Sequence, residues 1–202
     1  MIDKANLSDQ DLFDCAMHIC YELKMLAKLP KELVRFEGES DGDLVNTCLE
    51  SALGHARTLI EFLVGRPKRE HGAIVPGTRV RSRLDMDPSM FAPTWTAKDP
   101  AAFDGYLDVI DKSLSHLSLE RIKGANGPNW VLTDLADALI IVFRSFADSV
   151  DRSKPRIFTT FMSAATMADA QRTAGPKVWP QWKFETGDSV ISIGGFSGGS
   201  FS

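Results

Sequence analysis

Apolar residues recur at intervals of three and four along most of the first 172 positions of this 202-residue chain. Such intervals place side chains on one face of an α-helix. The pattern predicts five helices, at about residues 9–30, 43–64, 99–123, 128–150 and 155–172. Residues 31–36 could add a further turn to the first helix.

The second of these helices carries a very wide apolar face. On a helical wheel its apolar residues fill an arc of about 180°, which predicts burial on two sides and a central position. The residues on this arc are Cys48, Leu49, Ala52, Leu53, Ala56, Leu59, Ile60, Phe62 and Leu63. Gly65 and Pro67 follow and are expected to end the helix.

Residues 65–98 form a connection of about 34 residues, far longer than usual between helices, which indicates structure or function of its own. Residues 73–75 and 79–84 have strand-like composition, and Pro76-Gly77 between them predicts a hairpin turn. Six basic residues and one acidic residue make residues 65–84 basic, with a net charge of +5.

The predicted fold class is therefore all-α, an up-and-down bundle of four to five helices. We expect residues 1–172 to form this bundle, with residues 65–98 as an insertion. Residues 173–202 form a C-terminal extension that contains Trp179 and Trp182 and ends in glycine, serine and phenylalanine, which predicts a flexible tail.

Composition excludes several classes of protein. The net charge of −4 argues against a protein that binds nucleic acid or membranes over much of its surface. The sequence contains no apolar run of 18 residues, so no membrane span is predicted. The three cysteines, Cys15, Cys20 and Cys48, lie in helical patterns, which predicts reduced thiols and a cytoplasmic location.

One face of the first helix carries Asp11, Cys15, His18 and Glu22, spaced by four, three and four residues. All four residue types can bind a metal, but a helical metal site needs matching ligands on a facing helix. The sequence shows no second such stripe, so a solvated face is favoured. We expect no metal and no other cofactor, and a metal-binding or small-molecule-binding bundle remains the least favoured alternative.

His55 and Arg57 lie near opposite edges of the apolar arc of the second helix, and Glu61 follows Arg57 by one turn. Buried polar groups need partners, so structural hydrogen bonding is one interpretation of this pair and a functional role is the other.

Further candidates lie in the third helix and in the insertion. His116 faces away from the apolar stripe of its helix, one turn after Lys112, and a histidine is suited to proton transfer near neutral pH. Arg79, Arg81 and Arg83 would project from one face of a strand, where they can bind phosphates or an acidic partner. Alternatively, these arginines pair with the acidic helices of the protein itself.

Two of these motifs together resemble a known family. His55-Ala-Arg57-x-Leu-Ile-Glu61-Phe, followed by His116-Leu-Ser-x-x-Arg121 and Trp130, resembles a group of uncharacterised bacterial helical proteins. That group in turn looks like the HEPN superfamily of helical, often dimeric, metal-independent ribonucleases of toxin–antitoxin and anti-phage systems. Here Asp111 stands where the group has asparagine, and residues 109–112 contain no arginine, so the motif is incomplete.

The resemblance implies an RNA-binding protein or a degenerate endoribonuclease. His116 would handle the proton of the attacking or leaving oxygen, and Arg121, Arg57 or Lys112 would stabilise the phosphorane, with His55 nearby. RNA, and a second copy of the chain in a homodimer, are the partners that it implies.

The competing hypothesis is a non-catalytic interaction module, such as a regulatory subunit or an immunity protein. It would bind a protein partner through the aromatic residues of the C-terminal extension.

Overall fold

The computed structural model of the chain describes residues 7–35, 42–71, 73–81, 85–115 and 132–173. Four helices form a bundle: α1 (Asp9–Arg35), α2 (Gly42–Val64), α5 (Leu132–Asp148) and α6 (Pro155–Thr173). Between α2 and α5 lie a hairpin of β1 (Arg66–Glu70) and β2 (Ala73–Val80), the 3₁₀ turns η2 (Pro88–Met90) and η3 (Pro100–Phe103), and helix α3 (Asp104–Ser115). The predicted all-α bundle is confirmed.

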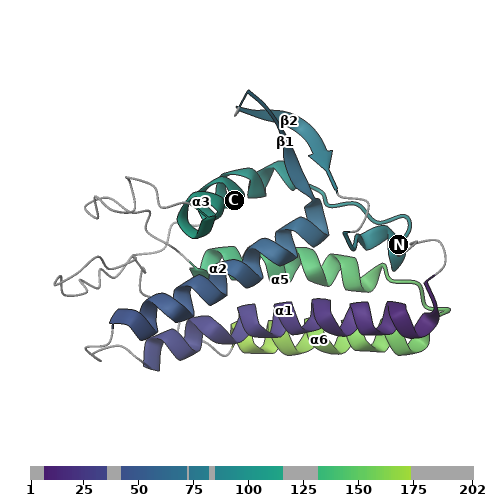
Figure 1. The fold of residues 1–202 in the computed structure, drawn as a ribbon. Helices are drawn as coiled ribbons and strands as arrows, with labels where there is room; N and C mark the ends of the chain where they lie inside the picture. Colours follow the sequence, from purple (N-terminus) through teal and green to yellow (C-terminus); the bar gives the residue numbers. More distant parts are fainter. Residues whose placement is uncertain (1–6, 36–41, 72, 82–84, 116–131, 174–202) are drawn as a thin grey trace.

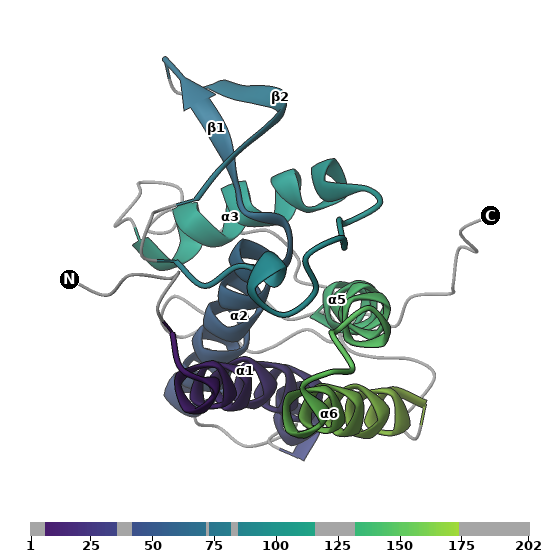
Figure 2. The same ribbon diagram turned by 90° about the vertical axis from the view of Figure 1, so that its right-hand side faces the viewer.

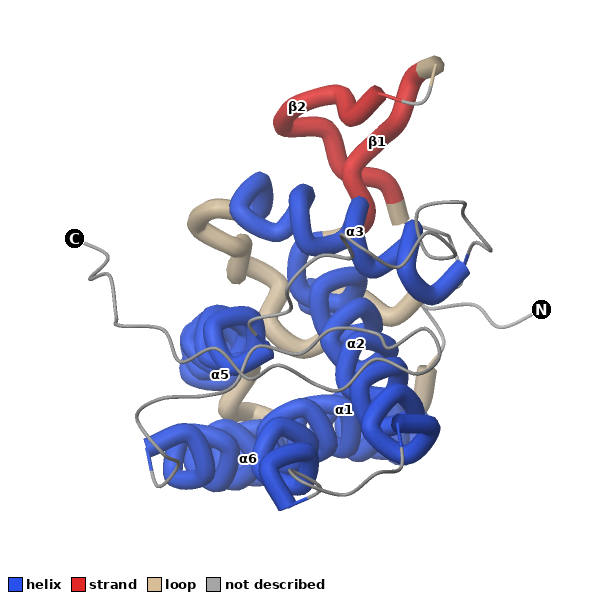
Figure 3. Tube along the Cα trace, turned by 90° about the vertical axis from the view of Figure 1, so that its left-hand side faces the viewer, coloured by secondary structure: helices blue, strands red, loops and turns tan. Residues whose placement is uncertain are grey.

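The helices are arranged in layers (Figure 1). Helices α1 and α6 lie side by side in one layer, α2 and α5 form the next, and α3 packs across α2 on the far side from α1 (Figure 2). The β1–β2 hairpin projects from this end of the molecule, beyond α3 (Figure 3). Of the helices that the structure describes, none has the length and apolarity needed to cross a bilayer.

The apolar stripes predicted from the sequence form the core. On α2 the arc from Leu49 to Leu63 is buried between α1, α5 and α3, which confirms its central position. Phe146 of α5 lies at the middle of an aromatic cluster, with four phenylalanine rings edge-on to it at centroid distances of 5.0–6.5 Å. The four are Phe62, Phe91, Phe143 and Phe161. Such edge-to-face contacts add to the stabilisation that burial provides.

The structure defines the ends of two predicted helices. Helix α1 continues through Pro30 to Arg35, so the further turn that the sequence allowed after the proline is present. The third helix begins as a 3₁₀ turn at Pro100 and becomes α-helical only at Asp104. A proline at the first position fits either helical form, so the sequence could not distinguish them.

The hairpin is present, but its turn was predicted at the wrong residues. Glu70 pairs with Ala73, so the chain reverses at His71, whose φ is +51°, and Pro76-Gly77 lies within β2. Two-residue hairpin loops require positive φ, which His71 adopts. Strand β2 runs without a break from Ala73 to Val80, so Arg79 and Val80 lie in the same strand as residues 73–75, Arg81 lies just after it, and residues 82–84 are outside the described residues.

The C-terminal end of α2 is capped by the segment that follows β2. Arg81 donates from Nη1 to the carbonyl oxygens of Glu61 (2.8 Å) and Phe62 (2.6 Å), and from Nη2 to that of Leu63 (3.2 Å). These carbonyls belong to the last helical turn; that of Glu61 also accepts from the Gly65 N–H at 3.0 Å, whereas those of Phe62 and Leu63 have Arg81 as their donor. Gly65, with φ +74°, follows the helix, and a Cβ there would lie 3.3 Å from Arg81 Nε. Glycine at this position therefore allows both the left-handed turn and the close approach of the arginine.

Candidate functional site

His55, a candidate for proton transfer, is held by a carboxylate of the neighbouring helix. Its Nδ1 lies 2.6 Å from Glu22 Oε2, and the ring of Tyr21 stands edge-on at 5.8 Å between centroids. The His55 side chain is 15% exposed and that of Glu22 is 22% exposed. This pair links α1 to α2.

Arg57 is directed toward α3 instead of α1. Its Nε donates to Glu61 at 2.8 Å, and its Nη2 lies 3.1 Å from Asp111 Oδ1. Arg66 of β1 binds the same Glu61 carboxylate. His55 and Arg57 are thus engaged with different elements, and the structure does not bring them together in one site.

Three aspartates on α3 form ion pairs with arginines from three other elements. Asp104, Asp108 and Asp111 share one face of the helix, since they are spaced by four and three residues. Asp104 pairs with Arg79 of β2, Asp108 with Arg69 of β1 at 2.6 Å, and Asp111 with Arg57. We call these three residues the aspartate stripe. Its pairs with Arg69 and Arg79 hold the hairpin against α3, and its pair with Arg57 holds α3 against α2.

The Arg79–Asp104 pair is the most buried of these ion pairs, because each side chain is only 16% exposed. Arg79 Nε and Nη2 are buried and have no hydrogen-bond partner among the described residues, so Asp104 supplies the compensating charge.

These contacts correct the expected face of three arginines. Arg79 pairs with an acidic helix of the chain, Arg81 caps α2, and Arg83 lies outside the described residues. For Arg79 the alternative interpretation holds, because this arginine pairs with an acidic helix of the protein itself.

The remaining candidate residues lie outside the described part of the structure, in whole or through their side chains. His116 and Arg121 lie outside the described residues, and so does the C-terminal extension from residue 174. Lys112 belongs to α3, and its side chain lies outside the described part of the structure. The ribonuclease roles of these residues stay predictions.

The stripe of potential metal ligands on α1 has other partners. Asp11 accepts hydrogen bonds from Ser8 of the helix start, which lower its pKa, and Glu22 binds His55. Within the described residues, no three His, Cys, Asp or Glu side chains gather closely enough to hold a metal ion.

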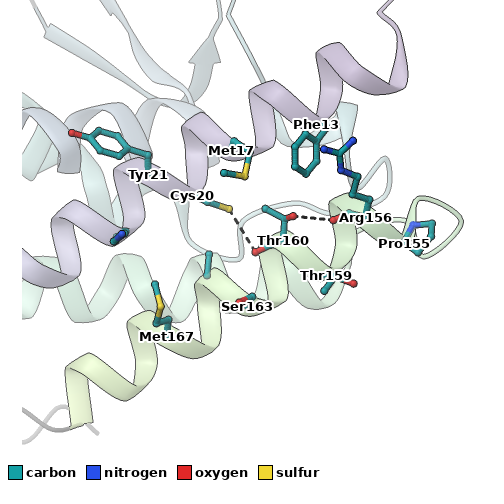
Figure 4. A pocket seen from close by; sticks show the side chains of 12 residues that line it. Phe13, Met17, Cys20, Tyr21, Pro155, Arg156, Thr159, Thr160, Ser163 and Met167 are labelled. Atoms are coloured by element: carbon teal, nitrogen blue, oxygen red, sulfur yellow. Dashed lines mark hydrogen bonds between the residues drawn. The ribbon is translucent and has the colours of Figure 1, made fainter.

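A groove of about 770 Å³ runs between α1 and α6 (Figure 4). Phe13, Met17 and Tyr21 line it from α1 at intervals of four residues, and Met167 lines it from α6. Met17 is 49% exposed, Tyr21 51% and Met167 44%, so large apolar side chains face solvent around it. Lone exposed apolar residues are ordinary, but a contiguous set around a groove is typical of a binding surface.

The groove exists because the facing side of α6 carries small residues. Thr159, Thr160, Ser163 and Ala164 line it. Helices α1 and α6 run parallel, as the contacts of Asp9 with Lys154 and of Cys20 with Thr160 show. Their inner faces pack on the core, and the short side chains leave the outer seam between them unfilled.

The ends of the groove are positively charged. The Arg156 guanidinium lies over the Phe13 ring, 3.5 Å from its centroid, and donates to Gln10. Lys24 is the last residue of α1 that lines the groove, at the opposite end from Phe13. No carboxylate occurs among the described residues that line it. An apolar ligand with negative charge at its ends fits this arrangement.

Cys20 lies in the groove wall, with its thiol 3.8 Å from the carbonyl oxygen of Thr160. Burial raises the pKa of this thiol to about 12. It is therefore protonated at neutral pH and acts as an apolar side chain.

Neither the aspartate stripe nor the groove was predicted from the sequence. The spacing of the three aspartates was a usable signal, since acidic residues on one face facing a basic hairpin predict ion pairs. The groove had no comparable signal, because it depends on which helices become neighbours.

Comparison with known proteins gave no relative: no protein-family model, no curated protein and no solved structure matches this chain.

Proposed function

We propose that the protein is a non-catalytic interaction module, which binds an amphipathic helix of a partner protein in the α1–α6 groove. The observation that carries this proposal is the half-exposed apolar lining formed by Met17, Tyr21 and Met167. Grooves between helices commonly bind the apolar face of a helix from another protein.

The dimensions favour a helix of about three turns. From Phe13 to Lys24 the groove follows eleven residues of α1, which is roughly 16 Å at 1.5 Å per residue. A bound helix of this length presents apolar side chains at three or four positions spaced by three or four residues. Carboxylates at its two ends would meet Lys24 and Arg156.

The arginines of α2 and of the insertion support this proposal, because those that the structure describes are already bound within the chain. Arg57, Arg69 and Arg79 bind the aspartate stripe, and Arg81 binds backbone carbonyls. An ion pair with a carboxylate of the same chain competes with a phosphate for the same guanidinium donors. The basic hairpin therefore offers RNA less free charge than its sequence suggests.

The test uses a fluorescent 14-residue helical peptide with four leucines along one face and glutamates at both ends. We expect saturable binding to the full chain by fluorescence anisotropy. Met17→Glu should weaken it at least tenfold, because it buries a charge at the apolar contact. Ile141→Glu is the matched control, since Ile141 is 58% exposed on α5 and does not line the groove.

Equal losses in the two variants, or equal binding of a peptide with terminal lysines, would contradict binding in this groove. The non-catalytic part has its own test. RNA cleavage in EDTA that is present in the wild type and absent in His116→Ala would overturn it in favour of the ribonuclease hypothesis.

A further inference from the structure

We infer that the C-terminal extension of the same chain occupies the α1–α6 groove when no partner is bound. The segment concerned runs from Trp179 to Glu185, and its occupancy would regulate the interaction. This inference rests on the proposed function, because it assigns the same groove as the binding site.

The position of the groove makes it accessible to this segment. Helix α6 ends at Thr173, six residues after Met167, which lines the groove. Six helical residues span roughly 9 Å, whereas the six residues from Thr173 to Trp179 can span roughly 20 Å when extended. The chain can therefore turn back and enter the groove at the Met167 end.

The composition of the segment matches the groove. Trp179-Pro180-Gln181-Trp182 contains two large aromatic residues and a proline, a composition that an apolar groove can bind in the extended polyproline form. With three residues per turn and about 3.1 Å per residue, Trp179, Trp182 and Glu185 share one side at intervals of roughly 9 Å. Two indole rings and one carboxylate then extend along roughly 19 Å, close to the length of the groove.

The direction of the segment also agrees with the charges. A chain that enters beside Met167 and runs back along α6 reaches Arg156 last. Trp179 would pack near Tyr21 and Met167, Trp182 near Met17, and Glu185 would meet the Arg156 guanidinium. The extension thus offers the same chemistry as the expected partner helix, aromatic and apolar groups followed by a carboxylate.

Tethering makes such a contact effective even when it is weak. A short flexible connection gives an effective concentration in the millimolar range. A segment with an intrinsic dissociation constant of about 0.1 mM would then fill roughly nine-tenths of the grooves, and a partner would bind about tenfold more weakly.

The first experiment replaces Trp182 by a benzophenone amino acid in the full-length chain and maps photo-crosslinks by mass spectrometry. Crosslinks within one chain to Met17, Met167 or their neighbours in the groove are expected. Crosslinks between two chains would overturn the inference in favour of a second copy as the occupant. Crosslinks to other elements, or none, would also overturn it.

The second experiment measures the affinity of the glutamate-ended peptide for full-length variants. Trp179→Ala/Trp182→Ala should raise it about tenfold, and Glu185→Lys should raise it more than the matched control Asp188→Lys. Equal affinity of wild type and the tryptophan variant refutes tail occupancy while the proposed function stands. Crosslinking in the groove without peptide binding to any variant refutes the proposed function, while the tail contact stands.

Discussion

Removing the carboxylate of Asp104 should destabilise the fold far more than removing that of Asp108, although both belong to the aspartate stripe. Asp104 and Arg79 are each 16% exposed, whereas Asp108 is 28% and Arg69 36% exposed. Removing one partner of a buried ion pair leaves an uncompensated charge, which costs about 3 kcal/mol. A partly exposed pair contributes about 0–1 kcal/mol.

Urea unfolding followed by circular dichroism measures this difference. Asp104→Ala should lower the free energy of unfolding by about 3 kcal/mol, and Asp108→Ala by at most about 1 kcal/mol. The double variant Arg79→Met/Asp104→Leu removes both charges and should recover most of the loss. Similar losses for the two single variants, or a double variant as unstable as Asp104→Ala, would refute the reasoning from burial.

Two other predictions concern Arg81 and Cys20. Arg81→Met should destabilise the protein by about 2 kcal/mol in urea unfolding, because the carbonyls of Phe62 and Leu63 lose their donor while that of Glu61 keeps the Gly65 N–H. Arg81→Lys keeps the charge without the planar fork and should lose part of this stability. Full stability of both variants would contradict the cap. At pH 8 the Cys20 thiol should be alkylated at least about tenfold more slowly than a thiol with the ordinary pKa of 9.0, because its pKa of about 12 leaves far less thiolate, which the higher nucleophilicity of that thiolate only partly offsets. Site-resolved mass spectrometry that finds Cys20 labelled as fast as Cys15 would contradict its burial.

The core of this protein was predictable because it depends on local spacing. The arc on α2 and the stripe of α5 through Phe143 and Phe146 follow from apolar residues at intervals of three and four. The hairpin was predicted as an element, but its turn was assigned to Pro76-Gly77. The reversal at His71 depends on which register pairs the strands, and composition alone does not determine register.

The candidate site was less predictable because it depends on packing between distant segments. Helical spacing placed His55 and Arg57 on different sides of α2, which the structure confirms, but it could not identify Glu22 and Asp111 as their partners. The groove needs α1 beside α6, two helices that are separated by most of the chain. Small residues such as Ser163 are too common in helices to predict it.

The insertion between α2 and α3 is attached to the bundle in two different ways, and this matters for protein engineering. The hairpin is held through charged side chains, whereas Phe91 is fully enclosed in the aromatic cluster and its carbonyl accepts a hydrogen bond from Asp151 at 2.9 Å. Foreign sequence can therefore be grafted at the tip near His71 with little effect on the scaffold. The same graft beside Phe91 would disturb its edge-on contacts with the rings of Phe62, Phe146 and Phe161 in the core.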